Sequence, residues 1–283
     1  MGRLNIAIST IAAVAALMVA GTASAQAVSP WTPTVGSFEG EVAYTNQSAK
    51  KFTVGSAKMA LPAELSLESF VASGSYGVTD KLAFDVSLGY AQSDFIVAPG
   101  LAPNGGLDGF TDVTIGGRYK LLDQVEGAPV TASIAVAAII AGDYDTGALP
   151  AIGDGGSGGQ VSGAVGWQNG PFSINGSLGF RARGNDVPDE TFGGVNASVG
   201  LGDRFSVYAG YGFVDSDGKL NVGGPGFSPA RFPELEEDYK FWSVGGSAVI
   251  TGATSINVSY GQKFDGKNTA LSNFTRVGIG FGF

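Results

Sequence analysis

The sequence predicts an all-β fold, namely a transmembrane antiparallel up-and-down β-barrel of the bacterial outer membrane with about 12 strands. The first observation is the segment 275–283, in which Val, Ile and Phe at odd positions alternate with Arg276 and three glycines. A large apolar face opposite a nearly bare one suits lipid outside and a confined lumen inside. The same alternation recurs along the chain. Charged residues make up only 14% and glycine supplies 46 of 283 residues, which is unusual for a soluble domain.

The N-terminal region has the pattern of a cleaved signal peptide over residues 1–25. A short basic start precedes an apolar run from Ile6 to Ala20, and Ala23-Ser24-Ala25 is a fitting cleavage site. We expect residues 26–35 to form a short periplasmic segment and residues 36–283 to form the barrel. No shift of composition within the latter range indicates a second domain.

Period-2 alternation divides the barrel region into 12 expected strands joined alternately by short and long connections. Short periplasmic turns and long outer loops are typical of such barrels. Long loops are expected at 46–63, 93–108, 143–157, 185–190, 215–237 and 266–272. The expected strands are 36–45, 64–78, 81–92, 109–122, 129–142, 158–168, 172–184, 191–202, 204–214, 238–251, 255–265 and 273–283.

The alternation also assigns the two faces of each strand. Large apolar residues such as Phe84, Leu88, Ile134 and Phe180 are expected on the lipid side, with small or polar residues opposite them. Two regions do not fit one register, because Leu65 and Leu67 are out of phase with Phe70, Tyr76 and Val78, and Tyr239 and Phe241 are out of phase with Trp242, Val244 and Ile250. We expect bulges there, or a different register.

Charged residues on the inner face are the candidate functional residues. Both signs occur in similar number, so a strong single-sign filter is not expected. They could form a constriction that favours neutral or zwitterionic solutes, or a salt-bridge network that closes the bore. The candidate residues of the lumen are Glu39, Glu41, Asp85, Asp112, Arg118, Lys120, Arg181, Arg183, Tyr208, Lys263 and Arg276.

Trp31 and Phe283 are two further candidates. Trp31 lies in a proline-containing segment that could fold back as a short plug or extend into the periplasm. Phe283 follows the last strand and resembles the terminal signal that the barrel-assembly machinery reads. Phe192 and Tyr208 are the aromatic residues expected to face inward, which would favour an apolar cargo.

The residue types that are absent exclude several function classes. The chain has no His and no Cys, so the general base of most hydrolases and any thiolate metal site are missing. A net charge of -9 argues against nucleic-acid binding, which needs a basic surface. We expect no enzymatic activity, no cofactor and no metal site.

The segment Gly109 to Leu122 resembles the Gly-x-x-Asp-Val-x-x-Gly-x-x-Tyr-x-Leu strand of the outer-membrane transporter family associated with MetA-pathway phenol degradation. The similarity continues loosely through Val130 to Asp143, Gly153 to Gly159 and Val195 to Gly202. This family is more distantly similar to the long-chain fatty-acid transporter barrels, whose substantial N-terminal plug has no equivalent here. The resemblance implies uptake of small hydrophobic or aromatic compounds.

Passive uptake of small hydrophobic or aromatic molecules is therefore the expected function. A general diffusion porin for small polar solutes and a structural barrel with a filled lumen are the alternatives. The expected location is the outer membrane of a Gram-negative bacterium, as an integral protein. Expected partners are outer-membrane lipids and lipopolysaccharide, the barrel-assembly machinery and a small-molecule cargo, with no nucleic acid. The oligomeric state stays open.

Overall fold

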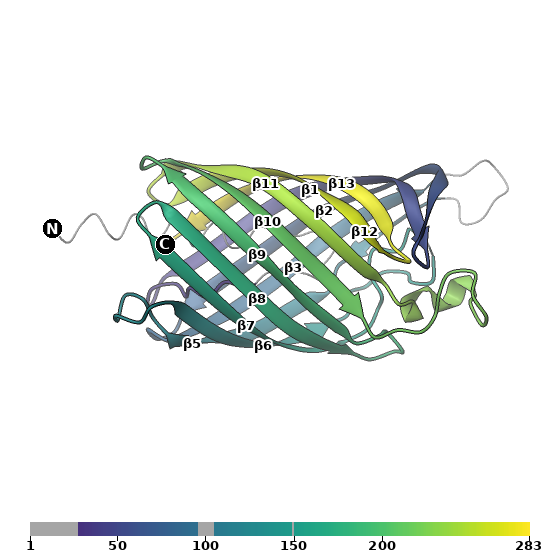
Figure 1. The fold of residues 1–283 in the computed structure, drawn as a ribbon, viewed down its shortest axis with the longest axis horizontal. Coiled ribbons are helices and arrows are strands. Elements are labelled where there is room, and N and C mark those ends of the chain that lie inside the picture. The colour runs from purple at the N-terminus through teal and green to yellow at the C-terminus, as the bar shows by residue number, and fades with distance from the viewer. Residues whose placement is uncertain (1–27, 96–104, 149) are drawn as a thin grey trace.

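The computed structural model describes residues 28–95, 105–148 and 150–283. The predicted signal peptide lies outside the described residues. The strands form one antiparallel sheet in the order β2-β1-β13-β12-β11-β10-β9-β8-β7-β6-β5-β3-β4, and a further pairing of β2 with β3 closes it. The chain is thus a closed antiparallel β-barrel, as Figure 1 shows.

The strand segments β4 and β5 are two parts of one wall position, because both pair with β3. They are interrupted at Thr111 and Asp112. Counted this way the barrel has 12 strands, which confirms the predicted fold class. The segments are β1 (Phe38–Val54), β2 (Ala57–Gly77), β3 (Leu82–Phe95), β4 (Gly105–Phe110), β5 (Val113–Leu122), β6 (Thr131–Ile140), β7 (Gly158–Asn169), β8 (Phe172–Arg183), β9 (Glu190–Leu201), β10 (Phe205–Ser216), β11 (Asp238–Thr251), β12 (Thr254–Lys267) and β13 (Ala270–Gly282).

The two ends of the barrel differ. At the turn end, Phe38 and Phe283 exchange two backbone hydrogen bonds, of 2.7 and 3.0 Å. The start of β1 therefore lies beside the end of β13. At the opposite loop end lie the β1–β2 hairpin and the short 3₁₀ helix η2 (Pro229–Glu234), as Figure 1 shows. In the described ranges, no helix is long and apolar enough to cross a membrane.

The predicted long loop at 46–63 is wrong. Strands β1 and β2 continue to Val54 and Ala57 and pair across that range, with a register shift between Ala49 and Lys51. A transmembrane β-strand needs about 9–11 residues, whereas β2 has 21. The hairpin therefore continues well beyond the length that a membrane requires. The sequence of this outer part of the hairpin is polar and resembles a loop, because neither face of its strands contacts lipid.

The two regions of conflicting register have different explanations. Strand β2 pairs with β3 without a shift from Ser66 to Gly77, so Leu65 and Leu67 simply face inward and no bulge is needed. Strand β11 also pairs with β10 without a shift, while its pairing with β12 has two shifts: Lys240 and Phe241 oppose Asp265 and Lys263, and Val249 and Thr251 oppose Ser255 and Thr254. One bulge is therefore in β12 and the other is in β11 at Ile250, and Tyr239 and Phe241 face the lumen.

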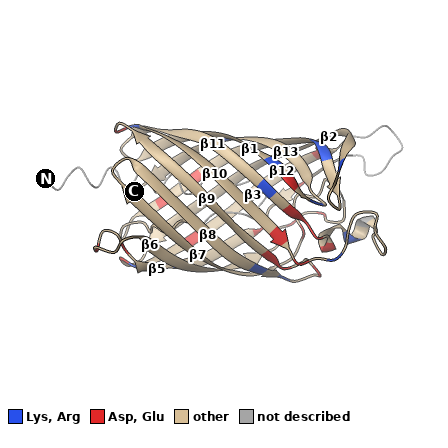
Figure 2. Cartoon of the chain, viewed as in Figure 1, with Lys and Arg blue, Asp and Glu red and all other residues tan. Residues whose placement is uncertain are grey.

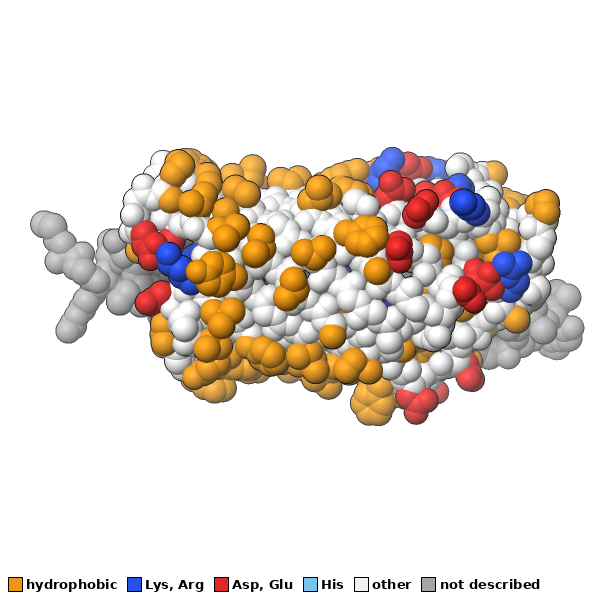
Figure 3. Space-filling view, turned by 90° about the horizontal axis from the view of Figure 1, so that it is seen from below, with side chains coloured by type: hydrophobic (Ala, Val, Ile, Leu, Met, Phe, Trp, Pro, Cys, Tyr) orange, Lys and Arg blue, Asp and Glu red, His pale blue; other side chains and the backbone are white. Residues whose placement is uncertain are grey.

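The outer surface carries the apolar side chains that the alternation predicted. Phe84, Leu88, Ile134 and Phe180 are each 45–49% exposed. Hydrophobic side chains spread along the barrel wall in Figure 3, while acidic and basic ones gather at its ends. Figure 2 shows most of the charged residues toward the loop end. An uncharged apolar band between two charged rims is the surface that a bilayer demands.

Candidate functional site

The interior of the barrel holds buried charged side chains from several strands. At mid-height, the Arg276 guanidinium on β13 forms an ion pair with Glu41 on β1, and both side chains are less than 5% exposed. Asn257 on β12 also donates to the Glu41 carboxylate. Since β12, β13 and β1 are neighbours, this cluster links the first strand of the barrel to the last two.

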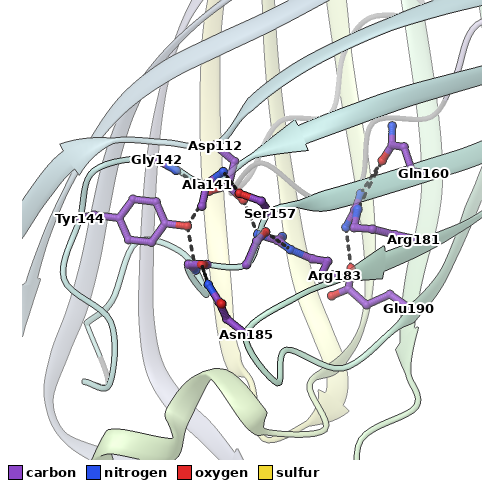
Figure 4. Close-up of polar contacts among 12 residues, drawn as sticks. Asp112, Ala141, Gly142, Tyr144, Ser157, Gln160, Arg181, Arg183, Asn185 and Glu190 are labelled. Carbon is purple, nitrogen blue, oxygen red and sulfur yellow. Dashed lines mark hydrogen bonds and ion pairs between the residues drawn. The ribbon is translucent and has the colours of Figure 1, made fainter.

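A second group of charges lies at the loop end, shown in Figure 4. The Asp112 carboxylate pairs with the Arg183 guanidinium from the far side of β6 and β7. It also accepts a hydrogen bond from the Tyr144 hydroxyl and one of 3.1 Å from the Gly142 amide. Arg183 in turn donates to the Gly156 carbonyl at 2.8 Å. These contacts hold the described parts of the β6–β7 connection, residues 141–148 and 150–157, against the inner wall.

The neighbouring Arg181 has its own partners. It donates to the Glu190 carboxylate at 2.6 Å and to the Gln160 side chain at 3.2 Å, as Figure 4 shows. Its guanidinium also lies over the Phe192 ring, 4.9 Å from the centroid. The lumen therefore combines ion pairs with aromatic surface at the same height.

The inward aromatic residues form a cluster, here named the aromatic wall: Phe192, Tyr239, Phe241 and Phe274, packed with Val214. Sequence reasoning named only Phe192 of these rings. Tyr239 and Phe241 were missed because the register of β11 was ambiguous, and Phe274 was missed although it shares the parity of Arg276. Tyr208, the other predicted ring, is 7% exposed on the same inner face.

Three of these rings, together with Tyr208, lie over glycines directly across the sheet. The registered pairs are Phe192 with Gly179, Phe241 with Gly212, Phe274 with Gly261 and Tyr208 with Gly245. A Cβ atom added at any of the four glycines would come within 2.3–2.4 Å of the opposing side chain. The bare glycine backbone thus lets each ring lie flat on the wall.

The N-terminal segment enters the turn end of the lumen. Arg118 on β5 donates to the Ser29 carbonyl at 2.9 Å and also binds Asp85 and Ser75, each at 3.1 Å. The Trp31 ring lies against Gly166 of β7. Ser29 and Pro30 are buried. Of the two expectations for this segment, the structure has the folded-back one.

The remaining predicted lumen residues are also on the inner face. Glu39 and Asp85 line the turn-end cavity described next, and Lys120 forms an ion pair with Asp123 in the β5–β6 turn. Lys263 lies over the Tyr239 ring, 4.0 Å from the centroid. Phe283 is 81% exposed at the rim, where its ring stacks on Phe38 at 5.3 Å.

Two cavities inside the barrel share no lining residue. The turn-end cavity, of about 100 Å³, is lined by Val28, Ser29 and Trp31 together with Glu39, Asp85 and Arg118. The loop-end cavity, of about 140 Å³, is lined by side chains of β1, β2, β11 and β12 and by the connections that fold inward. The Glu41–Arg276 pair lies between them, since Glu39 of β1 lines one cavity and Gln47 the other, while the aromatic wall borders the loop-end cavity through Tyr239. Within the described ranges, no group of acidic side chains has a metal-binding arrangement.

Comparisons with known proteins agree with this architecture. An outer membrane channel from Pseudomonas putida F1 superposes with a TM-score of 0.72 at 12% identity, covering 89% of this chain and 97% of that one. The transport unit of the autotransporter AIDA-I from Escherichia coli gives a TM-score of 0.50 at 13% identity, covering 99% and 98%. At these identities the likeness concerns the fold. A search of curated proteins found no match.

The family comparison is more specific than the structural one. The model of a family described as Gram-negative porin matches residues 133–283, which is more than half of the chain. The matched range contains β7 to β13 complete and nearly all of β6, and with them the aromatic wall and the inner charges Arg181, Arg183, Lys263 and Arg276. The chain belongs to the Gram-negative porin family, as a β-barrel of the bacterial outer membrane.

Proposed function

We propose that this barrel is a passive channel for small hydrophobic or aromatic molecules. The aromatic wall is the observation that carries the proposal. The lumen of a porin-like barrel is ordinarily polar, so four aromatic rings on its inner face are unusual. Because these rings face the lumen, they contribute nothing to lipid contact. They offer apolar surface in the loop-end half of the bore, where Tyr239 lines the loop-end cavity.

The chemistry of the lumen supports transport without catalysis. The chain has no His to act as general base, and the inner carboxylates Asp112, Glu41 and Glu190 are engaged by arginines. Because guanidinium groups hold their oxygen atoms, these carboxylates are not placed to take a proton from a substrate. The resemblance to transporters of phenol degradation supports small aromatic cargo in particular.

Two other functions have an observation in their favour. Membership of the Gram-negative porin family favours diffusion of small polar solutes. The buried Glu41–Arg276 pair between the two cavities favours a structural barrel that passes nothing. One experiment separates all three.

The test uses vesicles with a lipopolysaccharide outer leaflet, which itself resists apolar solutes, containing the refolded barrel. Phenol entry is followed by an entrapped phenol-oxidising enzyme, and glucose entry by entrapped glucose oxidase. We expect the barrel to accelerate phenol entry far more than glucose entry. Equal acceleration would establish the diffusion porin, and no acceleration of either would establish the structural barrel.

The variant Phe241→Ala removes the central ring of the aromatic wall. We expect it to change the ratio of phenol to glucose entry several-fold, because the apolar contact surface shrinks while space for water grows. The matched control is Phe180→Ala, whose ring is 46% exposed on the lipid side of β8. An unchanged ratio in Phe241→Ala would remove the aromatic wall from the transport path.

A further inference from the structure

The loop-end cavity contains charged groups that form no direct ion pair among the described residues, although the Lys263 and Glu237 charges attract each other at longer range. Arg183 pairs with Asp112 and Arg181 with Glu190, which leaves Lys263 of β12 and the carboxylates of Asp154 and Glu237. All three line the cavity. They come from three different parts of the fold: a strand, the β6–β7 connection and the residue just before β11.

Lys263 is the most unusual of the three. Its side chain is 7% exposed, and in the described part of the chain its ammonium group has no ion pair and no hydrogen bond, only the face of the Tyr239 ring. The Tyr239 hydroxyl is also buried without a hydrogen-bond partner among the described residues. Buried donors without acceptors are costly, so both groups are suited to an acceptor that a ligand brings.

The carboxylates of Asp154 and Glu237 are acceptors and are suited to a hydrogen-bond donor that a ligand brings. Glu237 accepts one hydrogen bond, of 2.7 Å, from Thr269, and Asp154 has neither an ion pair nor a hydrogen bond from any described residue. Burial raises the pKa of Asp154 to about 7, and the nearby Glu237 charge adds to the shift. Burial also raises the pKa of Glu237. Among the described residues, Asp154 thus has no hydrogen-bond donor, whereas ionised Glu237 is stabilised by the Thr269 hydroxyl and by the more distant Lys263 charge.

The rest of the cavity is of limited size and mixed in character, since Gln47, Ser93 and Tyr144 line it beside apolar side chains. Phe52, Leu65, Leu67, Ile152 and Leu235 contribute to its lining. A volume of about 140 Å³ matches the roughly 150 Å³ of an apolar cavity that holds one benzene ring. A ligand that fills this space and satisfies the charged groups needs an apolar body, an anionic acceptor and a cationic donor.

We propose that the loop-end cavity binds a small zwitterion, an apolar or aromatic molecule with an ammonium and a carboxylate group close together. Its carboxylate would face Lys263 and Tyr239, and its ammonium would face Asp154 and Glu237. The inference rests on the proposed function in treating the lumen as the route of the cargo, and it narrows that cargo to amphipathic molecules with both charges.

The test measures binding to the purified, refolded full barrel by titration calorimetry at pH 7. The probes are phenylglycine, benzylamine, which lacks its carboxylate, phenylacetate, which lacks its ammonium, and toluene, which lacks both. We expect phenylglycine to bind at least about tenfold more tightly than each of the others, because each charged group adds a charge-assisted hydrogen bond. Equal or tighter binding of benzylamine, phenylacetate or toluene would overturn the proposal.

Two variants test which charged group of the protein binds which charged group of the ligand. Lys263→Met should weaken phenylglycine binding while leaving benzylamine binding equal or tighter, and Asp154→Asn should weaken phenylglycine binding while leaving phenylacetate binding equal or tighter. The matched controls are Lys240→Met, an exposed lysine of β11 that pairs with Asp265, and Asp145→Asn in the same connection as Asp154. Should Lys263→Met fail to fold, Asp154→Asn still tests the site from a loop.

The binding test and the vesicle test fail in different ways. If the barrel admits phenol but binds phenylglycine no better than toluene, the channel stands and the zwitterion site is refuted. If phenylglycine binds selectively but neither phenol nor glucose enters vesicles, the site stands and the channel is refuted. Controls that weaken binding as strongly as Lys263→Met and Asp154→Asn would also refute the site.

Discussion

At the scale of single residues, the period-2 alternation predicts which face of a strand carries the charged side chains, but it cannot pair them. Arg183 and Asp112 meet across the width of two intervening strands. Alternation gives the direction of a side chain, whereas such a contact depends on the curvature of the wall and on an inward connection. The inward direction of Phe274, in contrast, could be predicted from the sequence, because it lies two residues before Arg276 and therefore on the same face of the strand.

The Glu41–Arg276 pair leads to a prediction about stability. Both side chains are buried, so removing one leaves the other charged and uncompensated. We expect Arg276→Met to lower the free energy of unfolding by about 3–5 kcal/mol, measured by urea titration of the refolded barrel in micelles. The double variant with Glu41→Gln should recover part of the loss.

The control is the Lys50–Glu64 pair on the β1–β2 hairpin, whose side chains are 78% and 47% exposed. Exposed pairs contribute about 0–1 kcal/mol, so Lys50→Met should have little effect. Equal losses for Lys50→Met and Arg276→Met would mean that burial does not distinguish the two ion pairs.

At the scale of elements, most strands could be read from the sequence because lipid demands an unbroken apolar face. The β1–β2 hairpin could not, since beyond the apolar band its residues alternate without a lipid-facing pattern. The interruption at Thr111 and Asp112 was also invisible, because the motif around it reads as one strand. Only the inward contacts of Asp112 explain why the strand is broken there.

The β6–β7 connection should respond to pH through Asp154. Burial raises the pKa of this carboxyl group from 3.8 to about 7, so the inward position favours the protonated form. Its stabilising contribution is complete below about pH 4 and is lost as the pH rises through about 7. We expect hydrogen exchange of residues 141–157 to become faster over that range.

The charged groups that face Asp154 set the size of this response. Glu237, Glu190 and Asp112 raise its pKa further, while Arg183 lowers it. Asp154→Asn should make the exchange rates insensitive to pH after correction for intrinsic exchange, whereas Asp145→Asn should not. A pH response that persists in Asp154→Asn would assign it to another group.

At the scale of the whole molecule, the bore is interrupted from the turn end by the N-terminal segment. Trp31 and Ser29 line the turn-end cavity, and the Arg118 guanidinium holds the segment by the Ser29 carbonyl. We expect Trp31→Ala to increase single-channel conductance in planar bilayers, because a large ring leaves the lumen. The control is Trp242→Ala on the outer face of β11, which should leave conductance unchanged. Lower or equal conductance for Trp31→Ala would show that the segment does not restrict the bore.

The glycines beneath the inward rings have a consequence for how the strands find their partners. The four glycine–ring pairs lie between β8 and β9, β10 and β11, and β12 and β13, and each of these hairpins is connected at the loop end. A long connection such as the one from β10 to β11 cannot fix the alignment by its geometry. A slip of two residues keeps every side chain on its own face, yet Phe192 would then oppose Ser177 or Arg181, and Phe274 would oppose Ser259 or Lys263. Misalignment of the β8–β9 or the β12–β13 hairpin therefore places a side chain beneath its ring, whereas in β10–β11 only one direction of slip does so for Phe241, which would meet Val214 one way and Gly210 the other. In the first two hairpins, the glycines beneath the rings thus help to select the correct register of the strands.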